Sequence, residues 1–230
     1  MRILFAAAVL PALALLILVY RADRSEKEPV GLLFKLLGFG ALAALPAMAV
    51  ELIGDKLLLG IYSEDDIMYN LLFHFVFVAG AEEGFKLLFL RVGSWKNPAF
   101  NYRFDGVVYA VFVSLGFALL ENILYVFQGG LSTALMRAVT AIPGHACFGV
   151  FMGVWYAMAK QHEREGSRAA ASWDMLMAFL VPLLLHGLYD FLLTVGTVGA
   201  FIIFIVFLIG MFVLAFMMVR RLSRRDTPIG

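Results

Sequence analysis

Long apolar stretches separated by short polar linkers make up most of this 230-residue chain. A helix needs about 20 largely apolar residues to cross the hydrocarbon core of a bilayer. Seven stretches meet this requirement, with expected bounds at residues 2–20, 30–54, 67–91, 105–127, 134–159, 173–194 and 198–219. The pattern predicts an all-α polytopic membrane helical bundle with about seven transmembrane helices. No linker is long enough for a second domain, so we expect one membrane-embedded domain over residues 1–230, with its core motifs in 67–194.

Composition supports the membrane interpretation. The chain is 63% hydrophobic and 15% charged, with a mean hydropathy of +0.91, whereas ordinary soluble domains carry about 25% charged residues. The net charge of +1 gives no reason to expect a nucleic-acid partner. Cys147 is the only cysteine, which excludes an intrachain disulfide and a cysteine-based metal cluster.

The positions of Lys and Arg predict the orientation in the membrane. Thirteen of the 18 basic residues lie after the first, third, fifth and seventh stretches. Because positively charged short loops stay in the cytoplasm, we expect the N-terminus outside and the C-terminus in the cytoplasm. The alternative is that the first stretch is a cleaved signal peptide, which would place the basic linker 21–29 outside, against the pattern of every later loop.

Ionisable side chains inside four of the stretches are the main functional signal. Each costs about 2.5 to 3.5 kcal/mol at the bilayer centre by insertion scales, so each needs a partner or a function. They and their polar neighbour are Glu82, Glu83, Lys86, Glu121, Asn122, His145, His186 and Asp190. The pairs Glu82/Lys86 and His186/Asp190 are four residues apart, so each pair shares a helix face. We expect all of these groups to meet in one hydrated cavity.

Structural roles are open for several of these residues and for two others. Lys86 is most simply a charge partner of Glu82 or Glu83, and Asn122 can bridge two helices. Glu51 is expected to extend toward a membrane surface from near a helix end. His74 is expected to be incidental.

The adjacent carboxylates Glu82 and Glu83 resist ionising together in a low dielectric, which suits proton transfer. One would take a proton from water, while His145 and His186 donate hydrogen bonds to the oxyanion of a tetrahedral intermediate. The supporting residues would be Lys86, Glu121, Asn122 and Asp190, with Asn122 and Asp190 orienting the imidazoles or donating in support. No cofactor is required by this scheme.

A metal-dependent alternative remains open. A divalent metal such as zinc could be held by ligands drawn from Glu82, Glu83, His145 and His186. The absence of an HExxH motif counts against this version.

Four ordered segments carry a family resemblance: AEEGFKLLFLR (81–91), RFDGVVYAVFVSLGFALLENILYV (103–126), PGHACFGVFMGVWY (143–156) and LLLHGLYDFLL (183–193). They resemble the motifs of the PrsW family of intramembrane proteases, in the superfamily of CAAX prenyl proteases and bacteriocin-processing membrane proteins. The resemblance implies cleavage of a peptide bond in or beside the membrane of a single-pass protein such as an anti-sigma factor, in site-1-type regulated proteolysis. It also implies a multi-pass protein of the bacterial inner membrane, with Glu82, Glu83, His145 and His186 as the catalytic centre.

Two other classes of function use similar residues. A proton-coupled transporter also needs buried Glu, His and Lys side chains, but the seven stretches show no paired halves. An inactive scaffold or immunity protein would be expected to lose part of the polar set, and this chain retains all of it.

Overall fold

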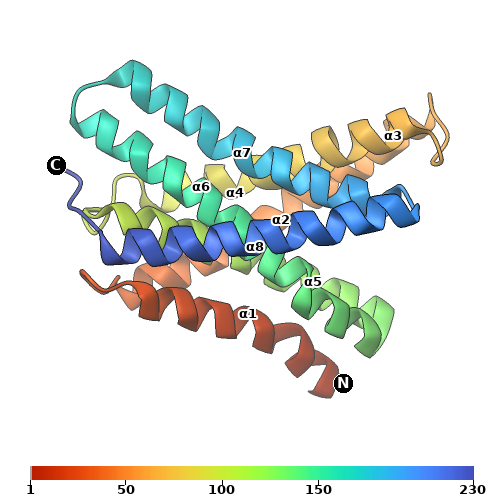
Figure 1. The fold of residues 1–230 in the computed structure, drawn as a ribbon, viewed down its shortest axis with the longest axis horizontal. Coiled ribbons are helices and arrows are strands. Elements are labelled where there is room, and N and C mark those ends of the chain that lie inside the picture. The colour runs from red at the N-terminus through yellow and green to blue at the C-terminus, as the bar shows by residue number, and fades with distance from the viewer. Residues whose placement is uncertain (1) are drawn as a thin grey trace.

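The computed structural model describes residues 2–230, which form helices joined by short loops (Figure 1). The elements are α1 (Arg2–Ala22), α2 (Val30–Leu59), α3 (Ile67–Leu72), the π-helix η1 (Phe73–Ala79), α4 (Gly80–Ser94), α5 (Arg103–Val139), α6 (Ala141–Arg164), α7 (Arg168–Thr194) and α8 (Val198–Arg224). No β-strand forms among these residues apart from one isolated bridge. The prediction of an all-α bundle is confirmed.

Within residues 2–230, five helical stretches are long and apolar enough to cross a membrane: Ile3–Ala22, Val30–Leu59, Arg103–Arg164, Arg168–Thr194 and Val198–Arg224. Of these, Arg103–Arg164 contains both α5 and α6. The remaining predicted span is the run of α3, η1 and α4, which carries the buried charges. The number of crossings and the orientation of the termini stay predictions.

The outer surface of the bundle is apolar. On α8, the side chains of Phe201, Ile202 and Val206 are 56%, 58% and 67% exposed. A continuous surface of this kind is unfavourable in water and stable against lipid tails. The fold is therefore that of a multi-pass membrane protein.

The helix α5 forms the centre of the bundle, because every residue from Phe104 to Ala118 is buried. Glycine lets its neighbours approach at backbone distance. A Cβ atom added to Gly153 of α6 would lie 2.5 Å from the carbonyl oxygen of Gly106, and one added to Gly116 would lie 2.1 Å from that of Leu37 on α2. These contacts fix α5 between α2 and α6.

The predicted break between the fourth and fifth stretches is found at Gly130, but the helix α6 begins later than predicted. The sequence predicts a linker at 128–133, followed by a span that begins at residue 134. In the structure the helix α5 continues to Val139, interrupted only at Gly130, where φ is 73°. The next helix begins after Thr140. A positive φ, which glycine adopts easily, redirects the chain here, so residues 131–139 form a short helical segment before α6.

The basic loops gather at one end of the bundle. Arg164 donates to the carbonyl oxygen of Ile229 at 2.9 Å, and the amide of Arg103 donates to that of Thr227 at 3.2 Å. Ser223 contacts the carbonyl oxygen of Ala22. Figure 1 shows the C-terminus and the α6–α7 turn at this end, and the N-terminus at the other. We refer to them as the basic end and the opposite end.

Candidate active site

Three charged side chains of α4 lie in the interior of the bundle. Glu82, Glu83 and Lys86 are 3%, 0% and 0% exposed. The Nζ atom of Lys86 lies 2.9 Å from Oε2 of Glu82 and 2.7 Å from Oε1 of Glu83. These spacings of four and three residues place both glutamates beside the lysine. The ammonium group of Lys86 therefore holds the two carboxylates together.

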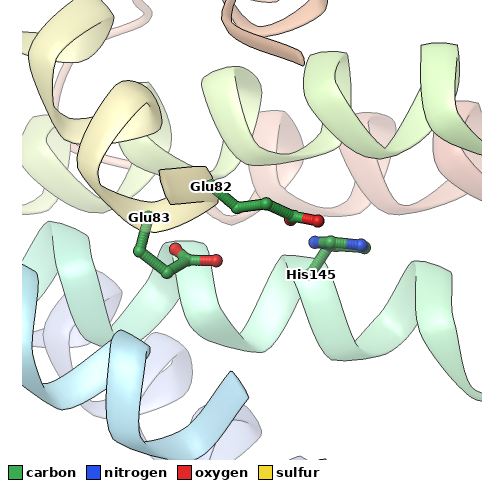
Figure 2. Close-up of side chains that lie close together, drawn as sticks. All are labelled: Glu82, Glu83 and His145. Carbon is green, nitrogen blue, oxygen red and sulfur yellow. The ribbon is translucent and has the colours of Figure 1, made fainter. Parts of the chain in front are cut away.

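Lys86 also fixes the tautomer of His145, which lies on α6. Its Nζ atom lies 3.1 Å from Nδ1 of His145. An ammonium group donates and cannot accept, so Nδ1 accepts and the ring proton lies on Nε2. That nitrogen lies 2.9 Å from Oε2 of Glu121 on α5, to which it donates. Figure 2 shows the side chains of Glu82 and His145 directed toward each other between α4 and α6.

The second histidine, His186 of α7, lies between two carboxylates. Its Nδ1 atom is 2.9 Å from Oε1 of Glu83, and its Nε2 atom is 3.2 Å from Oδ2 of Asp190. The ring stacks on Phe148, with centroids 4.7 Å apart. Both nitrogens face acceptors, which fits the imidazolium form, in which both donate. The ring centroid of His145 lies 5.4 Å from that of His186.

Arg137 joins the site, although the sequence did not single it out. Its Nη2 atom lies 2.9 Å from Oε2 of Glu121, and its Nε atom donates to Oδ1 of Asn122 at 2.8 Å. Asn122 in turn donates to the carbonyl oxygen of Ala8 at 2.7 Å. Asn122 thus bridges α5 to α1, and its side-chain hydrogen bonds involve neither imidazole. The only signal for Arg137 was a lone basic residue in an apolar run.

Two adjoining cavities reach this cluster. One, of about 450 Å³, is lined by His145, His186 and Asp190 and by apolar residues of α8, and we call it the α8-side cavity. The other, of about 370 Å³, lies between α2 and α5, and we call it the α2-side cavity. The two cavities share the lining residues Glu51, Phe73, Glu82, Glu121 and Tyr125. Some of the residues that line these cavities lie close to the opposite end of the bundle.

The two glutamates of α4 differ in their access to these cavities. Glu82 lines both, whereas neither Glu83 nor Lys86 lines either. The Oε2 atom of Glu83 is buried and has no hydrogen-bond partner among residues 2–230. Of the two, Glu82 is therefore the carboxylate that a water molecule in the cavities can contact. Glu83 lies away from the cavities.

The expectation for Glu51 is wrong, and the expectation that His74 is incidental stays a prediction. Both side chains line the α8-side cavity. Oε1 of Glu51 and Nδ1 of His74 are buried, with no hydrogen-bond partner in the described chain. The physical reason is helix length. The helix α2 continues to Leu59, so Glu51 lies about 12 Å from its end at 1.5 Å per residue.

Three of these side chains lie close enough together to be considered as ligands of one metal ion. Glu82, Glu83 and His145 each offer one ligand atom, and these atoms lie within 4.8 Å of one another. Nζ of Lys86 lies within 3.1 Å of an oxygen or nitrogen of all three. A zinc ion would need ligand distances of about 2.0 to 2.2 Å. The ammonium group of Lys86 already supplies a positive charge to all three side chains, and a metal on their other ligand atoms would lie beside it.

Comparisons with known proteins agree on one family. The family described as PrsW family intramembrane metalloprotease matches residues 28–218. Protease PrsW of Oceanobacillus iheyensis is 36% identical over 191 residues, which cover 83% of this chain and 82% of that protein. Protease PrsW of Halalkalibacterium halodurans is 32% identical over 223 residues, 97% of this chain and 98% of that protein. Protease PrsW of Bacillus subtilis is 32% identical, with 83% of each chain covered. No solved structure matches significantly.

Proposed function

The chain belongs to the PrsW family of intramembrane proteases, and we propose that it cleaves a single-pass membrane protein such as an anti-sigma factor, in or near its transmembrane segment. A bacterial inner membrane is the proposed location. The cut would be the first step of a regulated proteolysis that releases a transcription factor.

The position of Glu82 carries the proposed mechanism. It is the member of the buried Glu82–Glu83–Lys86 group that lines both cavities. Lys86 contacts its Oε2 atom at 2.9 Å, which leaves Oε1 for a water molecule. Glu82 is thus placed to accept a proton from water, because a general base must lie within hydrogen-bond reach of the proton that it removes.

Hydrolysis then follows in two steps. The hydroxide attacks the carbonyl carbon of the substrate, and the C–N bond of the tetrahedral intermediate breaks. Glu82 returns the proton to the leaving nitrogen, so that one water molecule is consumed and the carboxylate is restored. Lys86 keeps its charge throughout and holds Glu82 in place.

The oxyanion of the intermediate needs hydrogen-bond donors in the cavity. His145 and His186 both line the α8-side cavity. Their N–H groups are directed at Glu121, Glu83 and Asp190 before substrate arrives. Either histidine can serve as the oxyanion donor if it exchanges one of these carboxylates for the substrate oxygen. Asp190 is the most exposed of the three acids, with 22% of its side chain accessible, which favours His186.

We assign no step to a metal. The ammonium group of Lys86 already contacts Glu82, Glu83 and His145, and a dication placed beside it would be repelled. The word metalloprotease in the family description thus differs from the mechanism proposed for this chain. Glutamate-type catalysis is the version that these contacts support.

The cavities favour a cut in the half of the membrane away from the basic loops. Their outer linings include Asp55 near the end of α2, Leu193 near the end of α7 and Phe201 near the start of α8. These three positions belong to the opposite end of the bundle, which the charge pattern predicts to face outward. A bond on the outer side of the substrate's transmembrane segment would reach Glu82 by this route.

The test is cleavage by purified protein in lipid vesicles. Tagged single-pass anti-sigma factors from the same genome serve as substrates, and mass spectrometry of the fragments locates the cut. We expect one cut in the outer half of a transmembrane segment. Glu82→Gln should slow it by at least about 100-fold, while Glu165→Gln, at an exposed position at the basic end, serves as the control. Failure of the wild-type protein to cut any of them, or full activity of Glu82→Gln, would overturn the proposal.

A further inference from the structure

The lining of the α2-side cavity is acidic. Four carboxylate side chains line it, from Glu51, Asp55, Glu82 and Glu121. None of its lining residues within 2–230 is Lys, Arg or His. Four carboxylates also line the α8-side cavity, from Glu51, Glu82, Glu121 and Asp190, but there Arg137 and three histidines lie among them, together with apolar residues of α8. A substrate that occupies both cavities would therefore meet two chemically different walls.

Three of these four carboxylates already have a partner. Glu82 pairs with Lys86 at 2.9 Å, and Glu121 pairs with Arg137 at 2.9 Å. Asp55 accepts a hydrogen bond from the hydroxyl of Tyr69 at 2.5 Å.

Glu51 has no such partner. Its Oε1 atom is buried and accepts no hydrogen bond from the described residues. It lies eight residues before the end of α2, inside the predicted span, and a carboxylate there is costly unless a cation or a donor reaches it. The wall beside it is apolar and includes Met48, Leu52 and Leu124. A cationic group on an apolar stem fits such a wall, because the stem covers the apolar surface while the charge meets the carboxylate.

We propose that Glu51 forms a substrate-binding subsite for a Lys or Arg side chain that lies within a few residues of the cleaved bond. This inference rests on the proposed function and adds the substrate class. Glu51 lines both cavities, but its apolar neighbours Met48, Leu52 and Leu124 line only the α2-side cavity. The basic residue therefore extends to that side of the cut. An apolar residue on the other side contacts Phe201, Phe204 and Ile205 in the α8-side cavity.

Matched peptides test the subsite. The substrate is the peptide segment around the cut found above, with Lys or norleucine at each position on either side of it. Norleucine has the same four-carbon stem without the ammonium group. We expect Lys to raise kcat/KM at one position by about 10- to 100-fold over norleucine, as for a charge-assisted hydrogen bond in a buried site. The gain should lie mainly in KM, because Glu51 binds the substrate and takes no part in proton transfer.

Variants then assign the preference to Glu51. Glu51→Gln should reduce the ratio of kcat/KM for the Lys peptide to kcat/KM for the norleucine peptide to near one. Glu51→Asp should retain part of the preference for Lys. Glu51→Lys should favour a peptide with Glu at the same position. The control is Glu64→Gln, which makes the same charge change at an exposed site in the α2–α3 loop and should keep the wild-type ratio.

Each other outcome counts against the subsite. An active wild-type enzyme with no preference for Lys at any position overturns it. So does a Glu51→Gln variant that is equally slow on both peptides, because Glu51 would then act in the chemistry or the fold. The proposed function fails separately, in the vesicle assay above, if the wild-type enzyme cuts no single-pass substrate, which keeps the two failures distinguishable.

Discussion

The Nδ1 atom of His186 lies 2.9 Å from Oε1 of Glu83, which joins α7 to α4. The same oxygen lies 2.7 Å from Nζ of Lys86. One carboxylate oxygen thus receives two cationic donors, and the other oxygen of Glu83 has no partner among the described residues. Glu83 thus positions Lys86, which holds Glu82, and His186, which assists it. Glu83 itself lines neither cavity.

This arrangement predicts different kinetic effects for the two glutamates. In Glu83→Gln the carboxamide keeps the shape but removes the negative charge between Lys86 and His186. We expect kcat to fall by about 10²- to 10⁴-fold, with KM changed little because Glu83 does not line the cavities. Steady-state kinetics on the mapped substrate, with folded protein verified by gel filtration, measures both constants. A rise in KM at unchanged kcat would mean that Glu83 contacts the substrate.

Loss of Lys86 should damage the fold as well as the activity. The side chain is 0% exposed and lies between two carboxylates, with its ammonium group 4.2 Å from the ring centroid of Phe117. Lys86→Met would leave Glu82 and Glu83 without their shared cation, at a cost of about 3 to 5 kcal/mol in the free energy of unfolding. Thermal unfolding in detergent measures this loss. The double variant Lys86→Met/Glu83→Gln should recover part of it, and equal instability of the two variants would contradict the charge argument.

Chelation distinguishes the glutamate mechanism from a metal one. Since the ammonium group of Lys86 already contacts Glu82, Glu83 and His145, we expect cleavage to continue in a strong chelator. Added zinc should give no stimulation, and metal analysis of the active protein should find less than one ion per chain. Inactivation that zinc reverses would show instead that Lys86 withdraws and that a metal replaces it.

Local spacing in the sequence predicted the contacts within one helix. The separations of three and four residues from Lys86 to the two glutamates, and of four residues from His186 to Asp190, set which side chains share a face. Spacing does not show which neighbour faces a cavity. Consecutive residues point about 100° apart around a helix, and the π-helix Phe73–Ala79 just before α4 alters the register. The different exposure of Glu82 and Glu83 to the cavities therefore required the structure.

Contacts between helices were less predictable. Arg137 reaches Glu121 because the chain is redirected at Gly130. The sequence predicts a linker there but not the direction in which the chain turns. Glu51 was expected near a membrane surface, yet α2 extends beyond it and places its side chain against the cavities. Both residues are single charges in apolar runs, and their partners lie on other helices. A single sequence shows that burying such a charge costs free energy, but it does not show which partner compensates that cost.

A buried carboxylate at the basic end gives a prediction for stability against pH. Glu28, in the α1–α2 linker, is 2% exposed and accepts a hydrogen bond from the hydroxyl of Tyr109. Burial, with a smaller contribution from the charge of Asp105, raises the pKa of Glu28 to about 9. Burial also raises the pKa of Asp23 to about 6. Both acids therefore hold a proton more tightly in the folded protein than in the unfolded chain.

The folded state should thus lose stability as the pH rises. An acid with a raised pKa stabilises the fold fully below its unfolded pKa, about 4.3 for Glu, and this contribution is lost as the pH rises through the folded value. We expect a lower unfolding temperature in detergent at about pH 9 than at about pH 6. Glu28→Gln mimics the protonated acid and should flatten this slope, whereas the exposed Glu165→Gln should leave it unchanged. A wild-type protein that is more stable at the higher pH would show that Glu28 is ionised in the fold, with a cation near it.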